Sequence, residues 1–345
     1  AQELAPVLSP TPAPVSPTPA PVPASLQIDS VMVEGNTLIE SAAIQKALTP
    51  LLPYQGEAGN LASLAKLTDT VTGLYHAKGY FLAQAYLPEQ EIAGGVLKIA
   101  VLEGALGKIS VTGNRAYPES FIRGHFPKIE GEKQIHHQTF ERPLLILNEY
   151  MDLTATGLFE ASKTAGRSDL TLRVEEQRPL HYTLDYNNFG SKLVSRHRFG
   201  TGLEVGNWFK PGSVFSVRGV VGSPIENAVY GRVGYGAPAN FNGTRVNFTW
   251  GAGDFDVGRQ LAALKITMET MGWSLSATHP FIKTRSFTLS GETGLDFQDF
   301  EQNIGGLPGS LKETRSDRIR KIRGQLDYNR QRGQGRDLAT VSIHQ

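Results

Sequence analysis

Two hydrophobic patterns divide this chain near residue 179. Before that point, alternating segments are mixed with segments whose apolar residues recur every three or four positions, the spacing of an amphipathic helix. After it, short segments alternate strictly between apolar and polar residues and are separated by Gly, Pro, Asn and Asp. Strict alternation is typical of a strand whose two faces meet different surroundings. The pattern therefore predicts an α+β region followed by an all-β region.

A module occurs twice in the α+β region. Adding 78 to six positions of the first copy gives the matching positions of the second: Val31/Ile109, Val33/Val111, Gly35/Gly113, Asn36/Asn114, Gly79/Gly157 and Phe81/Phe159. A match of this length indicates two copies of a small domain, each with its own core. We place the copies at residues 26–104 and 105–178.

Each copy is predicted to run strand, helix, helix, strand, strand. In the first copy we expect strands at 26–33, 80–87 and 96–102, with helices at 40–52 and 61–78. In the second copy we expect strands at 109–111, 158–164 and 170–176, with helices at 117–125 and 140–156.

The all-β region, residues 179–345, is predicted to hold eight complete strands by Asn329 and a ninth from Asp337. Its strands of eight to eleven residues have one aromatic and aliphatic face and one polar face. Such alternation fits a soluble sandwich, with its polar face outside, or an outer-membrane barrel, with its polar face lining the lumen. Strand length, aromatic residues near strand ends and unequal connections, a tight turn at 209–212 and a long loop at 301–316, favour the barrel.

Nine strands do not complete such a barrel, because hydrocarbon tolerates no open sheet edge and bacterial barrels normally have even strand counts. We therefore expect residues 179–345 to be the N-terminal part of a larger barrel. By parity, five polar residues would line its lumen: Arg245, Asn247, Glu292, Arg323 and Asp327.

Residues 1–25 are rich in Pro, Ala, Ser and Thr and predict an extended tether. The chain begins Ala-Gln, which we interpret as the start of a mature exported protein. Cysteine is absent, which excludes disulfides and thiolate chemistry, and the net charge of +1 does not indicate a nucleic-acid partner. No apolar run has the roughly 20 residues of a membrane helix.

No group of residues predicts catalysis. His136 and His137 are neighbours that point different ways, and no Ser/His/Asp arrangement or phosphate-binding glycine loop has a supporting context. We therefore expect no enzyme, no cofactor and no metal site.

The repeated unit, with its Val-x-Val-x-Gly-Asn opening, resembles the POTRA domain, and the first copy resembles the variety found in hemolysin secretion/activation proteins. The stretches that carry this resemblance are residues 28–38, 79–83, 86–88 and 95–104, followed by 178–179, 185–191 and 206–212 at the entry to the barrel. Residues 26–345 together resemble TpsB transporters of two-partner secretion, a branch of the superfamily of polypeptide-transporting outer-membrane barrels.

The resemblance implies two β-α-α-β-β POTRA domains in the periplasm of a Gram-negative cell and a transmembrane antiparallel β-barrel of 16 strands. The implied function is ATP-independent export of a large β-helical adhesin or hemolysin, a TpsA-like partner held extended and unfolded. Outer-membrane lipid would be the other partner, and the transporter would be a monomer. Residues 1–25 contain no clear counterpart of the family's plug helix, and Val217-Arg218-Gly219-Val220 reads as ordinary strand alternation rather than the family's inward-loop signature.

The middle strand in sequence of a POTRA domain lies at a sheet edge, where an extended client could add as a further strand. The client-binding residues would then be Phe81, Ala83, Ala85 and Leu87 in the first copy and Leu158, Glu160, Ser162 and Thr164 in the second. The plainer interpretation is that these side chains only pack against the helices. Two other functions stay open: an assembly factor for outer-membrane proteins, and a soluble β-sandwich adhesin with two binding modules.

Overall fold

The computed structural model describes residues 26–345 apart from 57–60, 93, 128, 130–133, 165 and 307–312. The predicted tether at residues 1–25 lies outside the described residues. The described chain divides into two compact units, the first containing residues 26–78 and 83–103 and the second residues 79–82 and 104–345.

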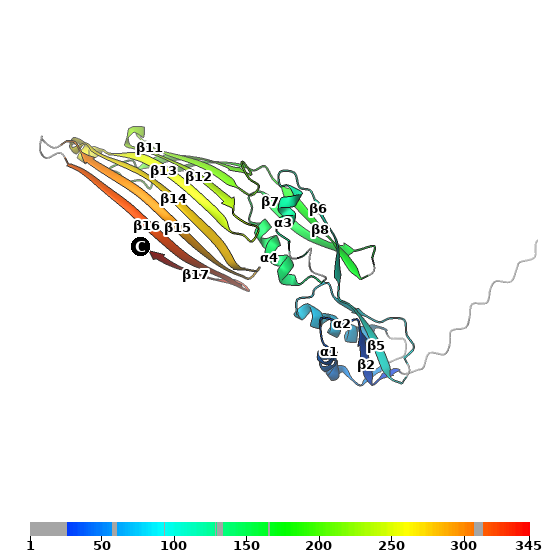
Figure 1. Ribbon diagram of the computed structural model, residues 1–345. Coiled ribbons are helices and arrows are strands. Elements are labelled where there is room, and N and C mark those ends of the chain that lie inside the picture. The colour runs from blue at the N-terminus through cyan, green and yellow to red at the C-terminus, as the bar shows by residue number, and fades with distance from the viewer. Residues whose placement is uncertain are drawn as a thin grey trace, which may run out of the picture. The chain divides into compact units, whose positions relative to one another are not determined.

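The first unit packs two helices on a three-stranded sheet of order β2-β5-β4 (Figure 1), in which β2 and β5 are parallel and β4 is antiparallel to β5. Its elements are β1 (Leu26–Ile28), β2 (Ser30–Glu34), α1 (Ser41–Leu48), a 3-10 turn (Thr49–Leu51), β3 (Tyr54–Gly56), α2 (Leu61–Ala77), β4 (Gln84–Tyr86) and β5 (Val96–Leu102). The short strands β1 and β3 form a separate pair that the sequence did not predict. Ile44, Leu67, Val71 and Ile99 form part of the buried core between helices and sheet.

The second module has the same strand arrangement, in the order β6-β8-β7. It consists of β6 (Ala105–Thr112), α3 (Glu119–Gly124), α4 (His137–Leu147), β7 (Leu153–Ala161) and β8 (Arg167–Glu176). Its core is a separate cluster that includes Phe121, Ile122, Phe126, Leu170 and Leu172.

The repeated Gly-Asn pair makes the same turn in both modules. Gly35 and Gly113 have φ of +82° and +85°, a left-handed conformation that glycine adopts without strain. A Cβ atom would lie 2.5 Å from the Val101 carbonyl oxygen at Gly35 and 2.2 Å from the Val174 carbonyl oxygen at Gly113. Close passage against the last strand therefore requires glycine at both positions.

A glutamate at the end of the last strand closes each of these turns. The Glu103 carboxylate accepts hydrogen bonds from the backbone N–H groups of Thr37 (2.6 Å) and Leu38 (2.7 Å) and from the Tyr75 hydroxyl (2.9 Å). Burial by itself would raise the pKa of Glu103, but hydrogen bonds from Thr37, Leu38 and Tyr75 outweigh it and lower that pKa. In the second module Glu176 accepts from three successive backbone N–H groups, residues 115–117.

The rest of the second unit is one antiparallel sheet of nine strands in chain order, whose edges are β9 and β17 (Figure 1). The strands are β9 (Leu180–Asn187), β10 (His197–Gly206), β11 (Val214–Ser223), β12 (Ala228–Pro238), β13 (Arg245–Val257), β14 (Ile266–Lys283), β15 (Phe287–Ile304), β16 (Glu313–Arg332) and β17 (Gly335–His344). Two 3-10 turns, Ile225–Asn227 and Arg259–Leu264, lie in its connections. No described helix is long and apolar enough to cross a bilayer.

Several predicted element bounds are wrong. Strands β14, β15 and β16 have 18, 18 and 20 residues, longer than the eight to eleven expected. Consequently both ends of the predicted loop 301–316 are paired strand, with Glu301 opposite Ser316. Polar residues on both faces of these strand ends concealed the continuing pairing.

The predicted helix 140–156 is wrong at both ends, because α4 begins at His137 and ends at Leu147. The Asn148 side chain explains the C-terminal end. Its Nδ2 donates to the Leu144 carbonyl (2.9 Å) and the Ala155 carbonyl (3.0 Å), and its Oδ1 accepts from the Ala155 N–H (2.7 Å). Asn148 thus caps the helix and binds the start of β7, so Leu153 and Thr154, read as helical from their spacing, are strand residues.

Candidate functional site

Strand β4, the edge strand of the first module, has only three residues, and helix α2 already occupies its outward groups. The Ala85 N–H donates to Thr72 Oγ1 (3.0 Å), and the Ala83 carbonyl lies 3.0 Å from His76 Nε2. Beyond the strand, the Gln90 carboxamide makes two hydrogen bonds to the backbone of Lys98 on β5, each 2.7 Å long. This edge therefore offers an added strand few open positions.

Strand β7, the edge strand of the second module, is longer and more open. Ala155 turns its N–H and C=O away from β8, toward Asn148, and residues of the same parity direct their groups the same way. These residues are Gly157, Phe159 and Ala161. Among the described residues, no group forms a hydrogen bond with their outward N–H and C=O groups. An extended segment could pair here along the outer half of β7.

The predicted edge residues fall in different places. Ala85 lies in β4 and Leu158 and Glu160 lie in β7, whereas Ser162 and Thr164 follow β7 in the turn to β8. Ala83 and Leu87 flank the three-residue β4. Phe81 belongs to the second unit, where its ring lies 5.2 Å from that of Phe159 and 6.2 Å from that of Phe140. The prediction of one continuous strand over 80–87 is wrong, because residues 79–82 leave the first module's sheet.

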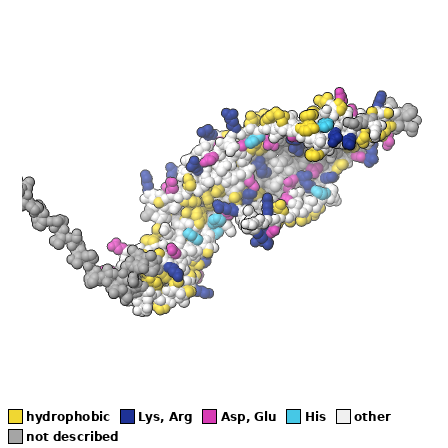
Figure 2. Space-filling view, turned by 180° about the vertical axis from the view of Figure 1, so that it is seen from behind, with side chains coloured by type: hydrophobic (Ala, Val, Ile, Leu, Met, Phe, Trp, Pro, Cys, Tyr) yellow, Lys and Arg dark blue, Asp and Glu magenta, His cyan; other side chains and the backbone are white. Residues whose placement is uncertain are grey.

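The nine-stranded sheet has one apolar and one polar face. Registered neighbours Val233, Trp250, Trp273 and Phe297 form one row across β12 to β15, and their face is exposed, with Trp250 at 41% and Trp273 at 38%. The opposite face carries polar residues, and Figure 2 shows acidic and basic side chains close together on the hollowed side of the sheet. No second sheet among the described elements covers the apolar face.

On β15 the apolar face is about as tall as the apolar band of an outer-membrane barrel. On β15 the apolar-facing positions run from Phe287 to Phe297 and then become Asp299 and Glu301. At ~3.3 Å per residue this stretch is about 33 Å long. A strand tilted by about 40° would then span about 25 Å, the height of the apolar band of an outer-membrane barrel.

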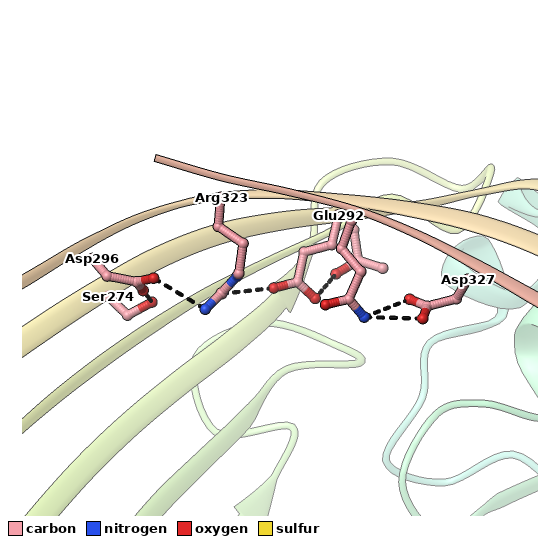
Figure 3. A network of polar contacts seen from close by, with 7 residues as sticks. Ser274, Glu292, Asp296, Arg323 and Asp327 are labelled. Carbon is pink, nitrogen blue, oxygen red and sulfur yellow. Dashed lines mark hydrogen bonds and ion pairs between the residues drawn. The ribbon is translucent and has the colours of Figure 1, made fainter. Parts of the chain in front are cut away.

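All five predicted lumen residues lie on the polar face, as their register shows. Arg323 forms ion pairs with Glu292 (2.8 Å) and Asp296 (3.1 Å), while Ser274 Oγ donates to Asp296 (2.6 Å) (Figure 3). Asp327 accepts from the Gln325 side chain (2.9 Å) and from Thr340 Oγ1 (2.8 Å).

Arg245 and Asn247 lie nearer the turn end of the sheet, apart from that network. Arg245 donates to the Gly212 carbonyl (3.2 Å), and its guanidinium lies over the Tyr150 ring at 5.5 Å. Arg245 thus joins the sheet to the second module in addition to facing the polar side.

Within the same unit, the second module contacts the sheet at the β12–β13 turn and near the end of β14. Arg142 of α4 donates to the carbonyls of Pro280 (2.5 Å) and Phe281 (2.9 Å), near the end of β14, and to that of Asn242 (3.4 Å), in the turn between β12 and β13. The Phe241 ring lies 5.0 Å from His125 and 5.9 Å from Phe121. We call this contact surface between the second module and the sheet the seam. The sequence did not predict Arg142 and His125 as part of it, because their partners are carbonyl groups and rings far away in the chain.

In this seam, the pKa of His125 lies far from its usual value. His125 is 2% exposed, its Nδ1 donates to the Phe121 carbonyl (2.8 Å), and its Nε2 lies 3.0 Å from the Tyr150 hydroxyl. Burial lowers the pKa of His125 to about 4 and raises the pKa of Tyr150 to about 12. A neutral imidazole therefore accepts a hydrogen bond from a protonated phenol here. The described residues contain no cluster of three or more His, Asp or Glu side chains that could hold a metal ion.

Comparison with known proteins adds a family and relatives. The POTRA domain of the ShlB type matches residues 26–104. The heme/hemopexin transporter protein HuxB of Haemophilus influenzae is 24% identical over 71% of this chain and 44% of its own length. The outer membrane transporter CdiB of Escherichia coli is 27% identical over 63% of this chain and 38% of its own. The chain thus spans less than half the length of these curated relatives.

Solved structures show the same fold. CdiB from Escherichia coli matches with a TM-score of 0.67 at 20% identity, over 97% of this chain and 61% of CdiB. BamA from Haemophilus ducreyi, lacking POTRA domains 1–3, matches with a TM-score of 0.53 at 16% identity, over 92% of this chain and 63% of BamA. The fold is therefore a POTRA-bearing segment followed by a large antiparallel sheet like the barrel of these proteins, left open in this chain. The chain is homologous to the transporters HuxB and CdiB and carries a POTRA domain of the ShlB type at residues 26–104, as its resemblance to TpsB transporters implies.

Proposed function

We propose that this chain is the POTRA-bearing part and first barrel strands of an outer-membrane transporter for two-partner secretion. The observation that carries the proposal is the nine-stranded sheet with one uncovered apolar face of membrane height, directly after POTRA-type modules. A soluble sandwich would bury that face against a second sheet, and contiguous apolar surfaces of this size are rare on soluble monomers. The POTRA modules would lie in the periplasm.

The client would be a secreted partner protein that arrives extended and unfolded. Its first contact would be strand addition at the outer half of β7, where Gly157, Phe159 and Ala161 each present two backbone groups. At about 0.5–1.5 kcal/mol net per hydrogen bond, six bonds would contribute about 3–9 kcal/mol before the cost of ordering the client. Such binding is weak enough to permit release into the pore.

The polar face would then line the path through the membrane, and folding of the client outside the cell would give the movement its direction. No step in this scheme uses ATP or a cofactor. The transporter would act as a monomer, because a closed barrel contains the whole path.

The first test uses the full-length protein in planar lipid bilayers and a strain that lacks it. We expect wide, fluctuating channels that persist when residues 26–178 are deleted, and the loss of one large protein from the culture supernatant of the deletion strain. A general loss of outer-membrane proteins would instead favour an assembly factor. A monodisperse protein in detergent-free buffer that forms no channel would contradict transport.

The β7 edge is tested by Ala161→Pro, which removes an outward N–H without breaking the β7–β8 ladder. Proline is tolerated at such edge positions, so the module should stay folded. We expect the supernatant level of the exported protein to fall several-fold, whereas Ala161→Ser, which keeps the N–H, should leave it unchanged. Equal secretion by both variants would exclude strand addition at this end of β7.

A further inference from the structure

Glycines on the polar face of the sheet stand directly opposite large polar side chains. Gly200 is paired with Asp185, Gly202 with Arg218 and Gly294 with Arg323. Other glycines on this face stand opposite polar residues of various sizes: Gly234 opposite Ser216, Gly236 opposite Asn247, Gly253 opposite Tyr230 and Gly272 opposite Gln298.

Two of these glycines, Gly200 and Gly294, are covered by the side chains opposite them. Gly200 and Gly294 are buried, although they belong to a single-layered sheet. A Cβ atom would lie 2.4 Å from Asp185 Oδ2 at Gly200 and 3.1 Å from Arg323 Nη2 at Gly294. On the apolar face, Gly231 and Gly324 have no atom within 4 Å of the same position. At Gly200 and Gly294 a neighbouring side chain fills the space that glycine leaves, whereas at Gly231 and Gly324 this space is empty. Gly291, also on the apolar face, is covered by the ring of Phe281, 2.7 Å from the Cβ position.

The ion pair between Arg218 and Asp185 shows what this room permits. Arg218 lies on β11 and Asp185 on β9, with β10 between them, yet Nη2 and Oδ2 are 2.8 Å apart. Strands two places apart are separated by about 10 Å, so the Arg218 side chain must lie flat across β10. It does so where β10 carries Gly202 and Gly200. A Cβ at Gly200 would meet Asp185 Oδ2 at 2.4 Å, so glycine leaves the room in which Asp185 meets Arg218, while a Cβ at Gly202 would lie 3.8 Å from Arg218 Nη1.

Arg323 uses Gly294 in the same way. Its guanidinium reaches the carboxylates two residues before and two residues after Gly294, at Glu292 and Asp296 (Figure 3). The three side chains are only about one-quarter exposed, at 26%, 26% and 27% for Arg323, Glu292 and Asp296. The charges are therefore closed against the wall of the sheet and do not project from it.

We propose that Gly200 and Gly294 are positioning residues that leave room for Asp185 and Arg323 to close the ion pairs of Arg218 and Arg323 against the sheet. An extended polypeptide moving over this face then meets neither a protruding side chain nor an unpaired carboxylate at these points. The ligand class is an extended chain of either charge. The inference rests on the proposed function, because it assigns the polar face to the path of the client.

The test measures how long short charged peptides stay in the channel of the full-length protein in planar bilayers. Oligolysine and oligoglutamate are added in turn, and the duration of each current block is recorded. Arg323→Leu leaves Glu292 and Asp296 without their cation, so we expect oligolysine blocks to lengthen on the order of tenfold, and oligoglutamate blocks not to lengthen. A variant that also carries Glu292→Gln and Asp296→Asn should return to the parent duration, an effect that misfolding would not produce.

Gly294→Leu and Gly324→Leu form a matched pair on adjacent strands. Leucine at Gly294 would displace Arg323, so this variant should lengthen oligolysine blocks, whereas leucine at Gly324 enters open space and should change nothing. If the parent and Arg323→Leu both form channels and their oligolysine blocks are equally long, the inference is overturned while the proposed transport function stands. If the parent forms no channel, the proposed function fails and the inference with it.

Discussion

His125 is the residue through which we expect the stability of the second module to depend on pH. Its ring contacts the rings of Phe121, Tyr150 and Phe241, the last in the turn between β12 and β13, and the Arg245 guanidinium lies over the Tyr150 ring. Because burial lowers the pKa of His125 to about 4, the folded state binds a proton less readily than the unfolded state, in which the value is 6.5. Stability is therefore full above pH ~6.5 and declines as the pH falls toward about 4.

We expect the seam around His125 to lose up to about 1.4 kcal/mol per pH unit within that window. Hydrogen exchange of peptides covering α3 and α4 in the full-length protein at pH 7 and pH 5 measures this loss. His125→Gln should remove most of the difference, while His344→Gln, at an exposed histidine of β17, should retain it. Equal pH dependence in the parent protein and His125→Gln would show that another group is responsible.

The segment between α2 and β4 follows the first module in sequence but belongs to the second unit in space. Residues 79–82 follow a helix of the first module but belong to the second unit, where His137 N–H donates to the Gly79 carbonyl (2.8 Å). Phe81 packs edge-on against Phe159 and His137. The Phe81 ring therefore packs against the core of the second unit, and its binding of a client stays a prediction.

Phe81→Ala should destabilise α4 and β7 by about 1–3 kcal/mol, because it removes a partly buried ring from an aromatic cluster. Hydrogen exchange of peptides from α4 and β7 should accelerate accordingly. Tyr86→Ala is the control, since Tyr86 on β4 is 42% exposed. Unchanged exchange in Phe81→Ala would mean that the ring contributes nothing to this core.

On the scale of the second unit, one side chain binds carbonyl groups of a turn and of a strand end. Arg142 donates to Asn242 in the β12–β13 turn and to Pro280 and Phe281 near the end of β14, and Glu149 forms an ion pair with Lys283 at that end. The seam therefore relies on contacts between α4 and the sheet, which would hold the module at a set angle while a client moves past β7.

Arg142→Ala should loosen the module on the sheet, because three carbonyl acceptors lose their donor. The chain has no cysteine, so one pair of introduced cysteines, at Glu160 and Asn240, can carry spin labels for a distance measurement in the full-length protein. We expect a broader distance distribution in Arg142→Ala. Arg173→Ala, an exposed arginine of the same module, should keep the parent distribution. Identical distributions in all three proteins would show that Arg142 does not hold the module.

Local patterns in the sequence determined the kinds of element and the faces of the strands. The Gly-Asn repeat marked two turns that only glycine can make, and strict alternation placed Arg245, Asn247, Glu292, Arg323 and Asp327 on one face. Both signals are local, since a positive φ is a property of one residue and parity is a property of neighbouring residues. The interpretation of Arg218 as part of an ordinary strand is confirmed by its position in β11.

Only the tertiary structure decided which edges are open, where the strands end and which distant groups meet. Thr72 and His76 occupy the edge of β4 because α2 happens to lie beside it, and the sequence alone carries no sign of that contact. Arg142 finds its acceptors about 100 and 139 residues away, and Arg218 reaches Asp185 across an intervening strand. The sequence by itself thus determined periodicity, turns and faces, because these depend on adjacent residues. The register of the strands, the helix that covers a sheet edge and the ion pairs that lie over glycines depend on which strands and helices become neighbours in space. The fold decides that.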